Sequence, residues 1–174
     1  PPAAGAAFHP IDPVRLVDTR ENRGVTGAFG PGRTATFRAV GAGGIPASGV
    51  TGVVLNVTAT QPTSESYLTV WPAGVGRPVA SSVNFRPGET VPNLVTTGVG
   101  AEGQVALFNE KGTVHVIVDV VGWYDDGYRY GATIETSRPT RVLDTRVAGT
   151  WGYYRDGVFN LGPDGPAPVD RLHA

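Results

Sequence analysis

The residues most able to do chemistry in this chain are an aspartate and an arginine that flank a threonine. They lie in the stretch PVRLVDTR, at residues 13–20, as Asp18, Thr19 and Arg20. A carboxylate beside a guanidinium is found at many catalytic sites, where each group alters the ionisation of the other. Residues two apart on a strand share a face, so the same pair would also suit a buried ion pair at a strand end, with the threonine bonded to backbone.

The same pattern returns near the other end of the chain. PTRVLDTR occupies residues 139–146 and again places an aspartate and an arginine around a threonine, here Asp144 and Arg146. A strand that opens a repeated unit would carry its ion pair in every copy. The recurrence therefore favours a structural role for both pairs, and it indicates that a second, incomplete repeat begins here.

A further group of polar residues lies inside apolar runs. It consists of three amides and a carboxylate, Asn56, Asn84, Asn93 and Asp119. Buried polar groups need hydrogen-bond partners, so we expect these four to form a structural polar network. Their oxygens could also hold calcium, but calcium loops cluster carboxylates, and these residues are dispersed. We expect no bound metal and no other cofactor.

The remaining signals for catalysis are weak. No G-x-S-x-G stretch marks a nucleophilic serine, and the histidines, His9, His115 and His173, are too scattered to predict a zinc site. Glutamates lie in several expected turns, so a carboxylate pair for glycoside hydrolysis stays open as a third hypothesis. Nothing singles out one such pair, and we expect the protein not to be an enzyme.

The best binding signal is an aromatic stripe in the run SYLTVW, at residues 66–71. Alternation places Tyr67, Thr69 and Trp71 on one face of this strand and the apolar residues between them on the other. The two rings would lie about 13 Å apart at the usual strand rise. Exposed rings in this arrangement would suit stacking against sugars, because each combines an apolar face with a polar tip. The alternative is that this face packs in the core or that Trp71 closes one end of the fold.

Composition excludes several classes of function. The net charge is −1 and only 17% of the residues are charged, so no basic field predicts nucleic-acid binding. The chain has no cysteine, which rules out disulfides and thiol chemistry. No apolar run reaches the roughly 18 residues that a membrane span needs. The sequence begins with proline, so we expect a processed or trimmed chain, which a removed secretion signal would fit.

Period-two alternation dominates the chain and predicts strands. Turns rich in glycine and proline separate these runs, and no segment has a convincing helical period. We therefore expect an all-β protein, an antiparallel, jelly-roll-like sandwich of about eight strands. The last long run is apolar on both faces and should be a central strand with both faces covered. The expected strands lie at 14–18, 34–40, 51–60, 66–71, 81–85, 93–99, 104–109 and 113–124.

The sandwich is expected to occupy residues 1–124. A polar, glycine-bearing joint follows at 125–135, and the partial second repeat occupies 136–174, with strands expected at 128–135 and 140–144. This segment is too short to build a core of its own. It should therefore pack on the first domain or on a neighbouring chain.

The C-terminal segment is also rich in aromatic residues, chiefly Trp151, Tyr153, Tyr154 and Phe159. Large apolar rings tend to be buried, which makes these four the candidate assembly residues. A strand of the segment could add to a neighbour's sheet. A head-to-tail contact of this kind would propagate into a filament.

The order of the motifs resembles a known domain. The order is RLVDTR, VVLNVTATQPT, SYLTVWPAG, RPVASSVNF, GETVPNLV, GAEGQVALFN and HVIVDVVGWY, over about residues 8–124. It is similar to that of a repeat domain in secreted actinobacterial cell-surface and accessory proteins, which stands beside hydrolases, peptidases or cell-wall proteins or in tandem arrays. The resemblance implies an extracellular β-domain without known catalysis, and it names no ligand.

These signals predict a secreted, non-enzymatic surface or adhesion module that binds a glycan, a cell-wall polymer or a partner protein. The second hypothesis is a structural subunit of an extracellular fibre or particle, a homo-oligomer or filament joined through the C-terminal segment. We expect no nucleic-acid partner and no membrane span. The protein is expected outside the cell, in association with the cell surface.

Overall fold

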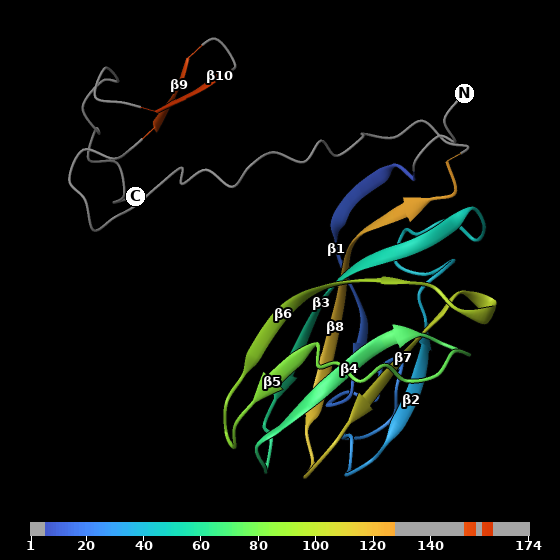
Figure 1. The fold of residues 1–174 in the computed structure, drawn as a ribbon, viewed down its shortest axis with the longest axis vertical. Helices are drawn as coiled ribbons and strands as arrows, with labels where there is room; N and C mark the ends of the chain where they lie inside the picture. The colour runs from blue at the N-terminus through green and yellow to red at the C-terminus, as the bar shows by residue number, and fades with distance from the viewer. Residues whose placement is uncertain (1–5, 128–151, 156–157, 162–174) are drawn as a thin grey trace. The chain divides into compact units, whose positions relative to one another are not determined.

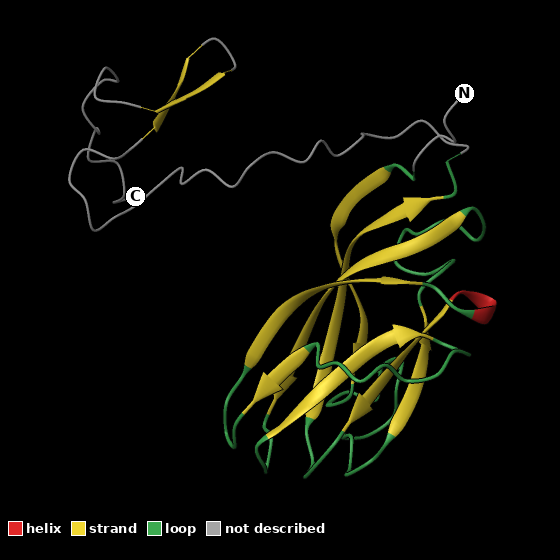
Figure 2. Ribbon diagram, viewed as in Figure 1, coloured by secondary structure: helices red, strands yellow, loops and turns green. Residues whose placement is uncertain are grey.

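The computed structural model describes residues 6–127, 152–155 and 158–161. Contacts divide the chain into two compact units, Pro1–Ile134 and Glu135–Ala174. The described part of the first unit contains eight strands in two layers and one short helical turn, Ala101–Gly103 (Figures 1 and 2). The second unit contributes two short strands.

Each layer of the first unit is a four-stranded sheet. One sheet has the order β1 (Phe8–Asp18), β8 (His115–Asp125), β3 (Val50–Thr60), β6 (Val91–Gly98). The other has the order β2 (Thr34–Arg38), β7 (Gln104–Asn109), β4 (Ser66–Pro72), β5 (Val83–Phe85).

The strand pairs are nested around one hairpin. β4 pairs with β5, β3 with β6, β2 with β7 and β1 with β8, and every pair is antiparallel. The pairing is that of one long hairpin wrapped into two layers, which is the jelly-roll arrangement. The expected all-β, jelly-roll-like sandwich of about eight strands is confirmed.

The core lies between the sheets and follows the alternation of the sequence. Val53, Leu55 and Val57 of β3 are fully buried there, and Leu68 and Val70 of β4 join the same cluster from the opposite sheet. These side chains occupy every second position, so the residues between them face outward. The face assignment expected for residues 66–71 is therefore correct.

β8 is a central strand, as expected, but its alternation is broken once. Its register steps between Val120 and Gly122, which leaves Val121 without a partner on either neighbouring strand. Such a bulge shifts the alternation by one residue. Trp123 therefore enters the core, although simple alternation from Val120 would point it outward. On the outer face Ile117 is buried, whereas Val121 is half-buried.

β8 also continues one residue past the expected domain end, to Asp125. The buried carboxylate of Asp125 accepts hydrogen bonds from the backbone N–H of Ala7 (2.8 Å) and of Gly127 (2.9 Å), and it lies 2.9 Å from Nε2 of His9. The His9 contact contributes most to lowering the pKa of Asp125 to about 2. Asp125 thus belongs to the sandwich and ties the end of β8 to the start of β1. The predicted boundary had assigned it to the joint.

The described part of the second unit is a hairpin of β9 (Gly152–Arg155) and β10 (Val158–Leu161), paired in antiparallel register. The sequence analysis did not predict these strands, and the strands it expected at 128–135 and 140–144 lie outside the described residues. The connecting residues are Asp156 and Gly157. An Asp-Gly pair between apolar runs is a strong hairpin signal, which could have located these strands.

Gly100 provides a test of this fold, because the backbone of the β4–β5 loop leaves no room for a side chain there. A Cβ at Gly100 would lie 1.8 Å from the carbonyl oxygen of Ala73, whereas one at Gly76 would meet no atom within 4 Å. The φ of Gly100 is −91°, so the obstacle is the clash alone. We expect Gly100→Ala to lower the free energy of unfolding by about 1–3 kcal/mol. Urea denaturation measures this, and Gly76→Ala should stay near the wild-type value. Equal stability of the two variants would contradict the predicted packing.

Candidate functional site

Asp18 ends β1 and carries a fully buried carboxylate between two arginines. Arg20 donates to it from Nε (2.9 Å) and Nη2 (2.6 Å), and Arg15 donates from Nη1 (3.1 Å). The hydrogen bonds from Arg20 are the main cause that lowers the pKa of Asp18 to about 2. A general base works best with a pKa near the working pH. Asp18 is therefore a poor proton acceptor and a good permanent anion.

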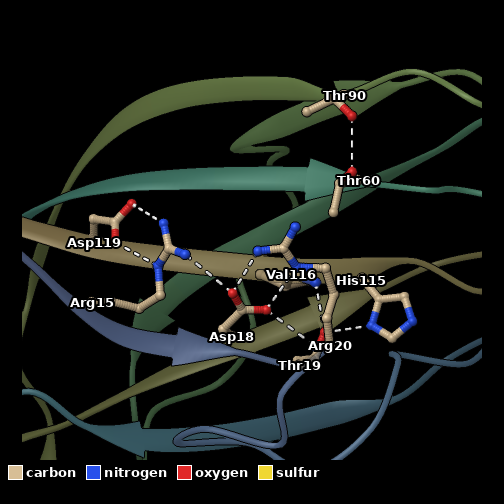
Figure 3. Close-up of polar contacts among 9 residues, drawn as sticks. All are labelled: Arg15, Asp18, Thr19, Arg20, Thr60, Thr90, His115, Val116 and Asp119. Atoms are coloured by element: carbon tan, nitrogen blue, oxygen red, sulfur yellow. Dashed lines mark hydrogen bonds and ion pairs between the residues drawn. The ribbon is translucent and has the colours of Figure 1, made fainter.

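Arg15 links this carboxylate to a second one. Figure 3 shows its guanidinium between Asp18 and Asp119. Arg15 donates to Asp119 from Nε (2.9 Å) and Nη2 (3.2 Å), a paired geometry that fixes orientation as well as distance. The two residues are direct partners on β1 and β8, so their contact holds the first strand to the last. Arg15 was not among the predicted site residues, although its recurrence as Arg141 in the second stretch was a signal.

Thr19 completes this network through β8. Its Oγ1 accepts a hydrogen bond from the backbone N–H of Val116 (2.9 Å) and lies 2.9 Å from Nδ1 of His115 (Figure 3). The expected bond from this threonine to backbone is therefore present. Both contacts engage the hydroxyl oxygen of a buried residue, so Thr19 is not placed to attack a substrate.

The geometry of Asp18 and Arg20 thus agrees with the structural interpretation. The two charged groups form an ion pair with each other and do not line a cleft. The surrounding contacts hold β1 to β8. The corresponding residues of the second stretch, Asp144 and Arg146, lie outside the described residues.

The polar residues expected to form one network are Asn56, Asn84, Asn93 and Asp119. No hydrogen bond joins any two of them within the described part of the chain, so the expected network is wrong. Asn84 instead donates to Oγ of Ser81 (3.0 Å) and Asn93 to the carbonyl of Ser82 (2.7 Å), while Asp119 serves Arg15. Asn56 and Asp119 are direct partners on β3 and β8, yet the carboxylate of Asp119 pairs with Arg15 from the strand on the other side. Asn84 lies on β5 in the other sheet.

The buried amide that does organise a network is Asn109, at the end of β7. Its Oδ1 accepts from Oγ of Ser66 at 3.1 Å. Its Nδ2 lies within 3.0–3.2 Å of four loop carbonyls, those of Phe29, Gly30, Lys111 and Gly112. Asn109 was not among the predicted polar residues. In the sequence it stands out only as a polar residue at the end of an apolar run.

The aromatic stripe lies on the outer face of β4, as alternation predicted, but the β4–β5 loop covers most of it. Nε1 of Trp71 donates to the carbonyl of Val75 (3.0 Å), and Oγ1 of Thr69 donates to that of Ala80 (2.8 Å). Trp71 is 6% exposed and Thr69 only 1%. The hypothesis that a sugar stacks on an exposed stripe is therefore ruled out for these two residues. Strand alternation does not predict a loop that folds over the sheet. Tyr67 alone remains half-exposed.

Tyr67 borders a hollow of about 570 Å³. Its hydroxyl donates to Oε2 of Glu110 (3.1 Å), which holds the ring at the margin of this space. Oε2 of Glu89 accepts a hydrogen bond from the backbone N–H of Arg86 (2.8 Å). The hollow combines two aromatic residues, carboxylates, an amide, a hydroxyl and two cations. It is lined by Glu65, Ser66, Tyr67, Asn84, Phe85, Arg86, Glu89, Glu110 and Lys111.

A second hollow, of about 310 Å³, adjoins the first. Tyr67 and Asn84 line both, and they are direct partners on β4 and β5. The remaining lining comes from the β4–β5 loop, with Arg77, Val79, Ala80 and Ser81. The candidate binding site is therefore this pair of hollows with Tyr67 and Asn84 between them.

The candidate assembly residues fall on the second unit. Tyr153 and Tyr154 lie on β9 and Phe159 on β10, where Tyr154 and Phe159 are direct partners. Trp151 lies outside the described residues. Assembly through this segment stays a prediction.

Comparison with known protein families and with curated proteins finds no match to this chain. The described residues contain no helix long and apolar enough to cross a membrane. In the same part of the chain no three histidine or acidic side chains are grouped so that they could hold a metal ion.

Asp18 generates a prediction about stability and pH. Its pKa is lowered in the folded state, so its contribution to stability is present above the unfolded value near 3.8 and is lost as the pH falls towards 2. Asp18→Asn should lower the free energy of unfolding by about 1–3 kcal/mol at neutral pH, because a neutral amide replaces the charged carboxylate to which the two arginines donate. Its loss of stability between pH 4 and pH 2 should then be shallower than that of the wild type.

Denaturant titrations at several pH values measure both effects. Asp12→Asn, an exposed aspartate of the same strand, is the matched control and should follow the wild type. A parallel pH dependence for wild type and Asp18→Asn would contradict the ionised network.

Proposed function

We propose that the protein is a secreted, non-enzymatic surface module that binds a glycan at the two hollows beside Tyr67. The observation that carries the proposal is the direct pairing of a half-exposed Tyr67 with an exposed Asn84, which both line the two hollows. Ligand sites commonly have volumes of roughly 300–1,000 Å³. Each hollow is therefore large enough for a small ring, and the two together for a short chain of rings.

The chemistry of the lining supports a sugar. A tyrosine ring offers an apolar face to the C–H surface of a pyranose. Amide, carboxylate and guanidinium groups donate to or accept from its hydroxyls. Oε2 of Glu110 and of Glu89 is engaged within the protein, which leaves Oε1 of each as an acceptor for a ligand hydroxyl.

The scaffold supports binding with little reorganisation. Tyr67 and Asn84 sit on paired strands, and Tyr67 is further fixed by its hydroxyl bond to Glu110. Groups held on sheet strands lose little freedom when a ligand binds, which favours affinity. Secretion and placement at the cell surface are supported by the resemblance in motif order.

Substitution at Tyr67 and Asn84 tests the proposal. Tyr67→Ala removes the ring, and Asn84→Ala removes the amide between the hollows. Each should weaken binding of a glycan found by array screening by about tenfold, the effect of losing about 1.4 kcal/mol. Isothermal titration of the full chain measures this. Thr96→Ala, an exposed position on β6 of the other sheet, is the control and should bind like the wild type.

Three results would overturn the proposal. The wild type could bind no glycan on the array, or the Tyr67 and Asn84 variants could bind as tightly as the control. Release of reducing sugar from the bound glycan by the wild type would show an enzyme in place of a binding module.

A further inference from the structure

The two hollows beside Tyr67 differ in charge. The first carries three carboxylates, Glu65, Glu89 and Glu110, with two cations, Arg86 and Lys111. The only charged residue that lines the second is Arg77. A ligand that spans both would therefore meet an excess of negative charge at one end and a single positive charge at the other.

Arg77 is held by stacking on an aromatic ring. Its guanidinium carbon lies 3.8 Å from the ring centroid of Phe108, so the plane of the side chain rests on an aromatic ring. Phe108 is itself buried, with 7% of its surface exposed, and it packs in a small hydrophobic cluster with Trp71, Ala73 and Ala106. Among the described residues Arg77 makes no ion pair and no hydrogen bond. The stacking positions the guanidinium while leaving its N–H donors open.

A stacked guanidinium is a receptor for a carboxylate. Its paired N–H groups match the two oxygens of a carboxylate, and a fixed plane lowers the entropy lost on binding. The second hollow also has polar partners for a sugar ring, because Asn84 and Ser81 lie in its lining and are joined by a hydrogen bond of 3.0 Å. The exposed Val79 adds an apolar surface.

We propose that the second hollow is a subsite for an acidic sugar, whose carboxylate pairs with Arg77. Tyr67 and Asn84 contact the link to a neutral sugar in the first hollow. The orientation follows from charge, since the carboxylates of the first hollow repel an acidic ring. The inference rests on the proposed function and adds to it the class of ligand, an oligosaccharide that contains a uronic acid.

The experiment compares two trisaccharides that differ only at the carboxyl group. The full chain is titrated with a linear trisaccharide of two neutral hexoses that ends in one galacturonic acid, and with the same trisaccharide after reduction of that carboxyl group. Wild-type protein should bind the acidic trimer about tenfold more tightly, as a charge-assisted hydrogen-bond pair predicts. Arg77→Gln should bind both trimers equally, with its affinity for the reduced trimer unchanged from the wild type.

Two further variants sharpen the result. Arg77→Lys keeps the charge but not the paired donors, so it should recover only part of the preference. Arg38→Gln removes an exposed arginine of β2 that lines neither hollow, and it should keep the full preference. Thermal unfolding of each variant confirms that the fold is retained.

The outcomes separate this inference from the proposed function. If both trimers bind equally and Arg77→Gln changes nothing, the acidic subsite is overturned while glycan binding stands. If a sulfated trimer binds more tightly than the uronic trimer through Arg77, the carboxylate assignment is overturned. If neither trimer binds but an array glycan binds through Tyr67, the uronic acid is wrong and the binding site stands. If no glycan binds at all, both proposals fail.

Discussion

The pairing of the first strand with the last is the constraint on which the rest of the sandwich depends. The nested arrangement is complete only when β1 pairs with β8. Arg15 and Asp119, which are partners in this pairing, are 104 residues apart in the sequence. Bringing such distant segments together costs chain entropy that local contacts do not offset. Polar contacts concentrate on this pair accordingly. The Asp18 network lies at one end and the Asp125 contacts at the other, with buried valines between them.

The candidate binding site lies at the opposite end of the nest, on the innermost hairpin of β4 and β5. The exposed residues of this site contribute little to closing the fold. Tyr67 packs only partly, and Asn84 and Arg77 are exposed. The exposed residues of the candidate site are therefore distinct from those that close the sandwich, so substitutions at these positions would leave the closing contacts in place. The β4–β5 loop is the exception, because it covers Trp71 and also supplies Arg77.

Sequence reasoning located the strands and their faces well because burial on one face imposes a period of two. It also predicted the ion pair of Asp18 with Arg20, which the structure contains, because two residues two apart on a strand share a face. It failed where the deciding partner is distant in sequence or is a backbone group. Trp71 is covered because its indole N–H meets the carbonyl of Val75, and a carbonyl leaves no mark in the sequence. The bulge at Val121 and the buried contacts of Asp125 depend in the same way on registers that only the assembled sheet defines.

The antiparallel pairing of β1 and β8 has a mechanical consequence. The start of β1 and the end of β8 lie together, with Phe8 opposite Tyr124, so the chain enters and leaves the sandwich at the same end of one strand pair. Tension applied through the flanking chain would pull these adjacent ends apart and break the ladder one rung at a time, as a zipper opens. The contacts of Asp125 with Ala7 and His9 would bear this tension first. The sandwich would thus begin to open at low force, by separation of the two strands that close it.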